Sequence, residues 1–481
     1  MVKNLTFWIA NLYLLMLLFF LSDCRAVELS NPCDPKSKVF NETLLLKLAL
    51  GDGSPICVSS RTPFTISGTI TGLLSPGLVL QNNGGEDQII GYGATSFRFP
   101  TKVADYRVTV KTQPRFYTCI VNNGSGRATS DITNVEVSCS PKQAGYLIVS
   151  NVTSQNISIY SINPSTGTLT QIAGSPISSG TCAPRGISLS PDSNFLYAAC
   201  QVENKIRAYA INRSNGSLSE ISGSPFDVPS GSPTKLAIDL TGKWLVLGTD
   251  NPFATIHMYS LNITSGTPTF LGSYTTSGAQ PYTVTFDSTG KFVYAGIGVG
   301  ANSGYVDGWT LNSTTGALTS VGASVSGGVN AIEITTDPAG RYLYAANYSA
   351  PGRVFVYTIN SISGVLAQIA GLGPGFSTVN DGPDSILVDP KSRFLYVGNQ
   401  TPSNLAGFTI DSSTGGLTAM SGSPFAGFTG ALAMDPAGTY LYSGTGGFVR
   451  AFSVNASTGV PTLIGTVTAG IDQTGLVIVS Y

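Results

Sequence analysis

Residues 342–347 read Tyr-Leu-Tyr-Ala-Ala-Asn, and strand-like segments of the same kind recur along the C-terminal part of the chain. A repeat of about 50 residues that contains only strands is typical of β-propeller blades. Successive segments are 46 to 52 residues apart, so they predict an all-β fold with a seven-bladed propeller over 145–481. The segments begin at Tyr146, Phe195, Trp244, Phe292, Tyr342, Phe394 and Tyr440.

A second marker repeats with the first: an Asn or Asp followed by a Gly four residues later. Asn suits the start of a tight turn because its side chain bonds the backbone, and Gly adopts the positive φ that such a turn needs. The marker also predicts seven blades. It occurs at Asn163 and Gly167, Asn212 and Gly216, Asn262 and Gly266, Asn312 and Gly316, Asn360 and Gly364, Asp411 and Gly415, and Asn455 and Gly459.

The two ends of the repeat are incomplete in complementary ways. Each blade should contain four strands, but the array starts at Gly145 with the second strand of a blade. The segment 474–481 is a lone first strand. We therefore expect it to complete the first blade and close the ring, which leaves no free sheet edge.

Two smaller segments precede the repeat. Over 61–141 the sequence alternates apolar and polar residues in six or seven short runs, which predicts a small Ig-like β-sandwich. Within 27–60, Asp34 and the Pro after it are followed by an apolar run to Leu50 and then a Gly. This order is typical of one short helix with an Asp N-cap, which the flanking cysteines would close into a disulfide-bonded cap.

The composition excludes several classes of function. The 481 residues include 25 Lys and Arg against 26 Asp and Glu, so 11% are charged, compared with about 25% in ordinary soluble domains. The net charge of −1 offers no electrostatic footprint for nucleic acid, and a single His excludes a multi-histidine metal site. P-loop, Rossmann and EF-hand patterns are absent from suitable elements, so we expect neither a metal nor a cofactor.

Residues 1–26 have the pattern of an export signal. Lys3 precedes an apolar run over 7–21 that is short for a membrane span, which needs about 20 apolar residues. The run leads to Cys24, as in the lipobox of bacterial lipoproteins, although an Asp precedes the Cys where a small residue is usual. Lipidation of Cys24, cleavage after Ala26 and an uncleaved anchor stay open. The first two place the mature protein outside the cytoplasm, as a bacterial outer-membrane or cell-surface lipoprotein or as a periplasmic or secreted protein, and only a lipid would hold it at a membrane.

The cysteine spacing supports export. Apart from Cys24, six cysteines form three close sequential pairs and no CxxC motif occurs, which is typical of a disulfide framework. If the turn at 191–194 joins two antiparallel strands, residue 200 returns beside residues 182–184, within disulfide reach. The expected bonds are Cys33–Cys57, Cys119–Cys139 and Cys182–Cys200.

The segments that enter the innermost strands line one mouth of a propeller's central channel, which is the default ligand site. Here they carry one cation, one carboxylate and several hydroxyls or amides, which suit a small anionic or sugar-like ligand. The alternative is that the mouth is polar only because water fills it. The expected positions are Arg185, Thr234, Tyr282, Asn330, Asp384, Thr429 and Gln473.

Residues 184–201 resemble a blade of the lactonase-type seven-bladed propellers, the 6-phosphogluconolactonase and muconate-cycloisomerase group. In that family a Pro-Arg-His opening, a Pro-Asp-Gly turn and a Tyr-Val-x-Asn-Glu close recur, and the Arg and Glu belong to the active site. Arg185 occupies the Arg position, whereas Gly186 replaces the His and Gln201 replaces the Glu. Because Gln cannot transfer a proton, the resemblance implies weak or absent lactonase activity. Glu203, two residues further along a continuing strand, is the weak catalytic candidate beside Arg185.

His257 does not supply the missing group, because we expect it on a third strand away from the channel, as a structural or surface residue. Residues 343–347 and 395–399 also resemble the Tyr-Val-Thr-Asn (YVTN) repeats of bacterial and archaeal surface propellers, which are binding or structural modules. We therefore expect a monomeric extracytoplasmic module that binds a small anionic or sugar-like ligand or an envelope protein. The alternative is a lactonase, a carboxylic ester hydrolase that acts on a sugar-derived lactone.

Overall fold

The computed structural model describes residues 38–50, 62–250, 254–278, 280–298, 304–328, 331–348, 351–369, 375–378, 381–427 and 430–481. The predicted export signal with Cys24, the predicted Asp34 N-cap and the expected Cys33–Cys57 bond fall on residues outside the described ones. The predicted short helix is present as α2 (Lys38–Leu50). Among the described residues, no helix is long and apolar enough to cross a membrane.

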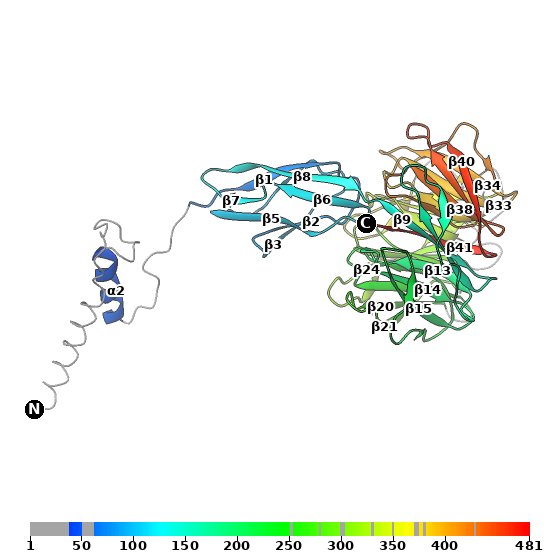
Figure 1. Cartoon of the computed structure of the whole chain (residues 1–481), viewed down its shortest axis with the longest axis horizontal. Helices are drawn as coiled ribbons and strands as arrows, with labels where there is room; N and C mark the ends of the chain where they lie inside the picture. The colour runs from blue at the N-terminus through cyan, green and yellow to red at the C-terminus, as the bar shows by residue number, and fades with distance from the viewer. Residues whose placement is uncertain are drawn as a thin grey trace, which may run out of the picture. The chain divides into compact units, whose positions relative to one another are not determined.

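Eight strands before the propeller form two four-stranded sheets (Figure 1). The first sheet has the order β4-β1-β8-β6, in which β1 and β8 are parallel, and the second has the order β3-β2-β5-β7. The Cys119–Cys139 disulfide joins directly opposed residues of β6 and β8. The strands are β1 (Ile66–Thr71), β2 (Val79–Asn82), β3 (Glu86–Ile89), β4 (Ser96–Arg98), β5 (Asp105–Thr112), β6 (Tyr117–Asn122), β7 (Ser125–Arg127) and β8 (Ile132–Pro141).

Seven further sheets within the described residues are the propeller blades, here numbered 1 to 7 and given from the innermost strand outward. Blades 1 to 3 are β41 (Gln473–Ser480), β9 (Ala144–Asn151), β10 (Asn156–Ile162), β11 (Leu169–Gln171); β13 (Pro184–Leu189), β14 (Phe195–Cys200), β15 (Lys205–Ile211), β16 (Leu218–Glu220); and β18 (Ser232–Ile238), β19 (Trp244–Asp250), β20 (Thr255–Leu261), β21 (Pro268–Thr275). Blades 4 and 5 are β22 (Gln280–Phe286), β23 (Phe292–Gly298), β24 (Gly304–Leu311), β25 (Leu318–Ser320); and β27 (Ala331–Thr336), β28 (Tyr342–Asn347), β29 (Arg353–Ile359), β30 (Leu366–Gln368). Blades 6 and 7 are β32 (Asp381–Val388), β33 (Phe394–Thr401), β34 (Asn404–Ile410), β35 (Leu417–Ala419); and β37 (Leu432–Met434), β38 (Tyr440–Thr445), β39 (Phe448–Val454), β40 (Pro461–Thr468). Short strands β12 (Ile177–Ser178), β17 (Phe226–Asp227), β26 (Val325–Gly328), β31 (Phe376–Ser377) and β36 (Phe425–Ala426) pair with the third strands of their blades.

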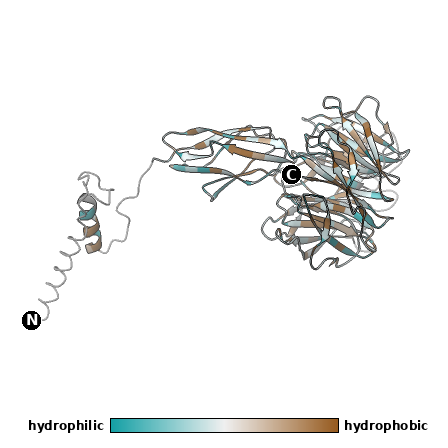
Figure 2. Cartoon of the chain, viewed as in Figure 1, coloured by the Kyte–Doolittle hydropathy of each residue, from teal (hydrophilic) through white to brown (hydrophobic). Residues whose placement is uncertain are grey.

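The second strand of a blade is an unbroken apolar run because both of its faces are covered. Every residue of β14 and of β28 is buried. In blade 2, Phe195 and Tyr197 pack against Leu245 and Leu247 of blade 3, and each neighbouring pair of blades has an equivalent apolar cluster. In Figure 2 the hydrophobic colour lies mainly on the strands rather than on the turns. The core is therefore a set of layers between blades, which only a complete ring can cover on both sides.

The ring closes as predicted. Strand β41 pairs with β9, with Leu476 opposite Val149 and Val477 opposite Ile148. The Asn-to-Gly marker forms the expected turn: in blade 2, Asn212 Oδ1 accepts the Ser214 backbone N–H at 3.0 Å. The seven predicted blades, the closing strand and the turn chemistry are thus confirmed.

Candidate functional site

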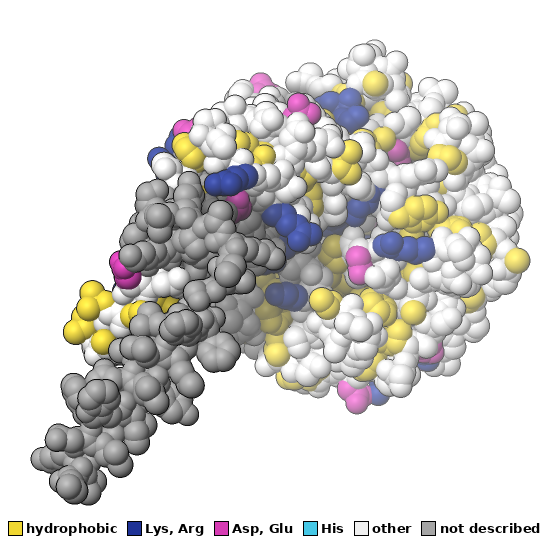
Figure 3. Space-filling view, turned by 60° about the vertical axis from the view of Figure 1, so that its left-hand side comes forward, with side chains coloured by type: hydrophobic (Ala, Val, Ile, Leu, Met, Phe, Trp, Pro, Cys, Tyr) yellow, Lys and Arg dark blue, Asp and Glu magenta, His cyan; other side chains and the backbone are white. Residues whose placement is uncertain are grey.

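A cavity of about 550 Å³ lies where the innermost strands of the propeller begin. Charged side chains are sparse on the protein surface, as Figure 3 shows for one face. The cavity brings together two cationic and two acidic side chains, each from the innermost strand of a different blade. Its wall includes Arg185, Lys235, Tyr282, Glu333, Asp384 and Gln473.

A β-bulge places three of these side chains, those of Arg185, Tyr282 and Asp384. In β13 the partners of Pro184 and Gly186 are the adjacent residues Cys200 and Ala199, so Arg185 is an extra residue. Bulges at the same position make Tyr282 in β22 and Asp384 in β32 extra residues as well. A bulged residue is left out of the pairing ladder and its side chain is re-aimed. Blades 2, 4 and 6 can therefore each direct one side chain into the mouth without losing the pairing of their sheets.

The structure brings together four of the seven positions expected from the sequence. Arg185, Tyr282, Asp384 and Gln473 line the cavity. Thr234 does not: it is fully buried, and its hydroxyl donates to the Pro281 carbonyl at 3.0 Å. The expectation for Thr234 is wrong because its side chain turns to the backbone of blade 4. Asn330 and Thr429 lie outside the described residues.

An ion pair that the sequence analysis missed crosses the cavity. Lys235 Nζ of blade 3 lies 2.8 Å from Glu333 Oε1 of blade 5, and it also donates to the Thr474 carbonyl at 2.7 Å. Thr283 of blade 4 donates to Glu333 Oε2 at 3.3 Å. The pair therefore links four blades, counting Thr474 of blade 1. The sequence feature that could have revealed this pair is that both residues are charged and lie near the start of otherwise apolar strands.

Of the two carboxylates that the innermost strands bring to this cavity, Glu333 is paired with Lys235, whereas Asp384 has no ion-pair partner among the described residues. Gln400 Nε2 donates to Asp384 Oδ2 at 3.0 Å, and Tyr348 Oη donates to Gln400 Oε1 at 2.9 Å. Asp384 Oδ1 is buried and has no hydrogen-bond partner in the described chain. Burial is the main reason that the pKa of Asp384 rises to about 6, and the nearby Glu333 carboxylate raises it further. This group can change its protonation state close to neutral pH.

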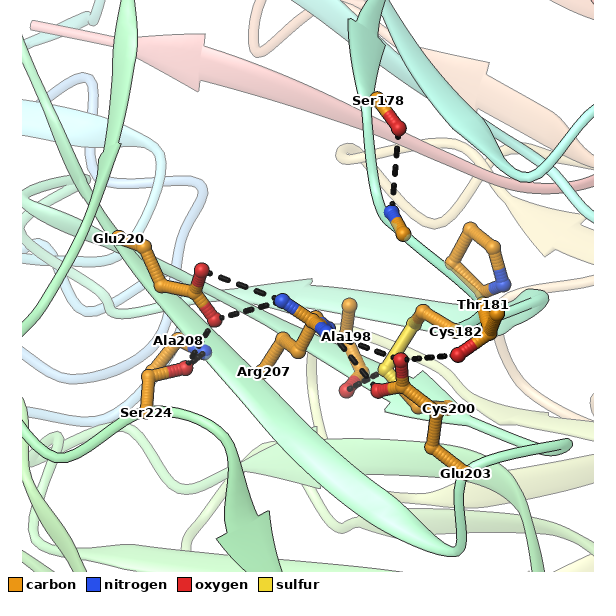
Figure 4. The surroundings of a disulfide bond; sticks show 12 residues. Ser178, Thr181, Cys182, Ala198, Cys200, Glu203, Arg207, Ala208, Glu220 and Ser224 are labelled. Carbon is orange, nitrogen blue, oxygen red and sulfur yellow. Dashed lines mark hydrogen bonds and ion pairs between the residues drawn. A yellow bond between two sulfur atoms is a disulfide. The ribbon is translucent and has the colours of Figure 1, made fainter.

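Glu203 lies away from the cavity, in an ion-pair cluster beside the Cys182–Cys200 disulfide (Figure 4). The Arg207 guanidinium donates to Glu203 Oε1 at 2.8 Å and to Oε2 at 3.0 Å, and Thr181 donates to Oε1 at 2.8 Å. These hydrogen bonds, that of Arg207 foremost, lower the pKa of Glu203.

From the sequence, a continuing strand was predicted to keep Glu203 on the same side as Gln201. That expectation is wrong because β14 ends at Cys200 and the chain turns over 201–204. Gln201, at the family's Glu position, does line the cavity.

The predicted Cys182–Cys200 disulfide is present, with Pro184 opposite Cys200 in the strand register. It ties the segment that enters β13 to the end of β14. Because Arg185 follows directly after Pro184, the bond helps to fix the position of the cavity's Arg.

His257 has the structural role expected of it. It is fully buried on β20, where Nε2 lies 2.9 Å from the Ser230 carbonyl and Nδ1 lies 2.8 Å from the Ser273 hydroxyl. Burial lowers its pKa, which favours the neutral ring. It is absent from the described lining of the cavity.

Comparison with known proteins identifies the propeller. The profile of the family described as lactonase, 7-bladed β-propeller, matches residues 119–238, 244–377 and 366–477. A candidate 6-phosphogluconolactonase from Bacteroides uniformis is 17% identical with a TM-score of 0.59, covering 70% of this chain and 100% of its own. A periplasmic gluconolactonase from Pseudomonas aeruginosa is 17% identical with a TM-score of 0.56, covering 70% of this chain and 99% of its own. No curated protein sequence matches the chain.

The two structural neighbours establish the fold, and the family profile covers more than half of the chain. The chain therefore belongs to the lactonase family of seven-bladed β-propellers.

Proposed function

We propose that the protein binds and hydrolyses a sugar-derived lactone in the cavity at the channel mouth. The observation that carries this proposal is one cavity that holds the cations of Arg185 and Lys235 together with the carboxylate of Asp384. Cations stabilise the negative charge that develops on the carbonyl oxygen during ester hydrolysis, and a carboxylate that titrates near neutral pH can take up a proton. Family membership supports the same reaction.

The wall of the cavity supports a sugar-derived substrate. Tyr282, Gln201, Gln400 and Gln473 offer hydroxyl and amide groups that can bond the hydroxyls of a sugar ring. Gluconolactone and phosphogluconolactone give the structural neighbours their names, and they are the first lactones to test.

A ligand-binding module without turnover is the second candidate. Gly186 and Gln201 favour this candidate, because they replace the family's His and Glu. The Lys235–Glu333 ion pair favours it as well, because Glu333 already neutralises the charge of one of the two cations in the cavity. In this case the cavity binds a small anionic or sugar-like ligand, or an envelope protein binds at its rim.

We also propose that the protein works outside the cytoplasm. The Cys119–Cys139 and Cys182–Cys200 bonds support this location, because the cytosol keeps thiols reduced. A lipid on Cys24 would hold it at a membrane. Mass analysis of the mature N-terminus checks this: acylated Cys24 supports anchoring, and an unmodified start at Val27 contradicts it.

The test of function is a hydrolysis screen of the purified full chain against sugar-derived and simple lactones, followed by acid release at constant pH. We expect turnover above the spontaneous rate, and we expect Arg185→Ala to lower kcat/KM by about 100-fold, as loss of one charge-stabilising donor does. Arg98→Ala is the matched control, because Arg98 is exposed on β4, outside the propeller. Turnover that Arg185→Ala leaves intact contradicts the assigned site.

The same proteins separate hydrolysis from binding. If no lactone is turned over but calorimetry detects an aldonic acid that binds the native chain and not Arg185→Ala, the binding module replaces the hydrolase.

A further inference from the structure

We propose that Asp384 is the general base of this protein, the group that takes a proton from the attacking water. The proposal rests on the proposed lactone hydrolysis. It supplies the proton-transfer function that the family's Glu position, occupied here by Gln201, cannot provide.

The other carboxylates of the cavity are less suited to this role. Glu333 lies 2.8 Å from the Lys235 ammonium through Oε1 and accepts a hydrogen bond from Thr283 through Oε2, so both of its oxygens already have partners. Asp472 lies on an exposed loop, where Thr153 Oγ1 is 3.5 Å from Oδ2. Asp384 alone of the three combines a place on a bulged innermost strand with a buried oxygen, Oδ1, that no hydrogen bond in the described chain stabilises. Its other oxygen, Oδ2, accepts from Gln400 and is the oxygen that would receive the proton.

Neighbouring side chains hold Asp384 in one orientation. The chain of hydrogen bonds runs from Tyr348 Oη to Gln400 and from Gln400 Nε2 to Asp384 Oδ2. Both donors are neutral, so they fix the carboxylate without the strong stabilisation of its charge that an Arg or Lys would give. A base held in this way keeps its affinity for a proton.

The charged groups around Asp384 set when it can act. Glu333 on β27 raises its pKa and Lys235 on β18 lowers it, while Gln400, from β33 of its own blade, contributes a hydrogen bond that lowers it. Burial outweighs both lowering effects, so the ionised form predominates only above about pH 6. The other titratable residues of the described wall are Arg185 on blade 2, Tyr282 on blade 4, Tyr348 directly after β28 of blade 5, and Asp472 directly before β41.

The step balances without a cofactor. The water oxygen forms a bond to the lactone carbonyl carbon while one water proton passes to the Asp384 carboxylate. The bond from this carbon to the ring oxygen then breaks, and the ring oxygen takes the proton from Asp384 to become a hydroxyl. One water is consumed, and the product is an open-chain hydroxy acid whose carboxyl proton passes to solvent.

The experiment measures kcat against pH for the full chain, with the fastest substrate of the lactone panel. We expect native kcat to rise with pH through about 6. Asp384→Asn should lose about 100-fold or more in kcat together with this rising limb, while Asp384→Glu should restore part of the rate. Asp411→Asn is the matched control, because Asp411 lies in an exposed marker turn where six other blades have Asn.

The outcomes separate the two proposals. If Asp384→Asn keeps its kcat and its rising limb while Arg185→Ala loses activity, the hydrolase stands and Asp384 is not its base. If instead Glu333→Gln removes the limb, Glu333 is the base. If the native chain hydrolyses no lactone, both proposals fail. Melting curves of Asp384→Asn and Asp384→Glu show whether a lost rate reflects unfolding, and a folded Asp384→Glu that regains rate supports the base.

Discussion

The phenol of Tyr442 donates a hydrogen bond to the carbonyl of Gly167 at 3.0 Å across the seam between blades 7 and 1, although the two residues are 275 positions apart. Equivalent bonds join Tyr197 to Gly266, at 2.7 Å, and Tyr294 to Gly364, at 2.8 Å. The two repeat markers of the sequence, the aromatic strand and the turn Gly, are therefore partners in one contact between adjacent blades.

The marker glycines should tolerate no side chain. Gly167 has φ +70°, and a Cβ built there would lie 2.2 Å from the Tyr440 ring, so Gly167→Ala suffers both backbone strain and a clash. We expect it to lower the free energy of unfolding by about 2–4 kcal/mol in urea titrations. Gly174→Ala is the control, because Gly174 has φ +82° with nothing within 4 Å of its Cβ, and about 1 kcal/mol is expected. Equal losses for the two variants would refute the clash.

Removal of residues 474–481 should open the ring. Without this segment, β9 has a free inner edge and the apolar clusters on both sides of blade 1 lose part of their cover. We expect urea unfolding to lose its cooperativity and to start at lower urea concentrations. A truncated chain with the same single transition as the full chain would contradict closure by β41.

The Cys182–Cys200 bond should stabilise the fold. It closes a loop with a sequence separation of 18, which corresponds to about 3 kcal/mol in the loop-entropy description. The double variant Cys182→Ser with Cys200→Ser should show this loss. It should also lower turnover, because Arg185 follows the tethered segment. The matched variant Cys119→Ser with Cys139→Ser should lower stability but leave the hydrolysis rate unchanged.

Asp384 should make stability depend on pH. Its pKa in the folded protein, about 6, is above the ordinary value, so folding favours the protonated form. This contribution is full below about pH 4 and is lost as the pH rises through 6. At pH 7.5 we therefore expect Asp384→Asn to be more stable than the native chain by about 1–3 kcal/mol, with the difference vanishing near pH 4. Thermal melts at both pH values measure this, and an equal difference at both would exclude Asp384 as its source.

Glu203→Gln should leave lactone hydrolysis unchanged, because Glu203 pairs with Arg207 outside the cavity. The expected effect is on stability alone, and it should grow as the pH rises through the lowered pKa of Glu203, since only the charged form pairs with Arg207. Steady-state rates and melts of the same preparation test both statements. A large loss of kcat would return Glu203 to the candidate site.

The sequence predicted the propeller well because its signals are local and repeated. The aromatic strand and the Asn-to-Gly turn recur in every blade, so an error in one blade does not change the count. The candidate site was harder because it depends on single bulges. Arg185 and Asp384 were found from their position alone, whereas the one-residue choice between Thr234 and Lys235 depends on which of them the bulge turns inward. The turn after Cys200 carries Glu203 away from the cavity, but residues 201–204 include no Gly or Pro that would have predicted the end of the strand.

The order of synthesis gives the closing strand a further consequence. Ser150 and Gly475 lie side by side in blade 1, yet they are 325 residues apart in the chain. At about 5–20 residues per second, a ribosome needs roughly 15 to 65 s to make the stretch between them. Throughout that time the inner edge of β9 is open to a strand from another nascent chain. A ring that leaves no free edge once it is finished therefore has one unpaired strand edge until its last residues have been made.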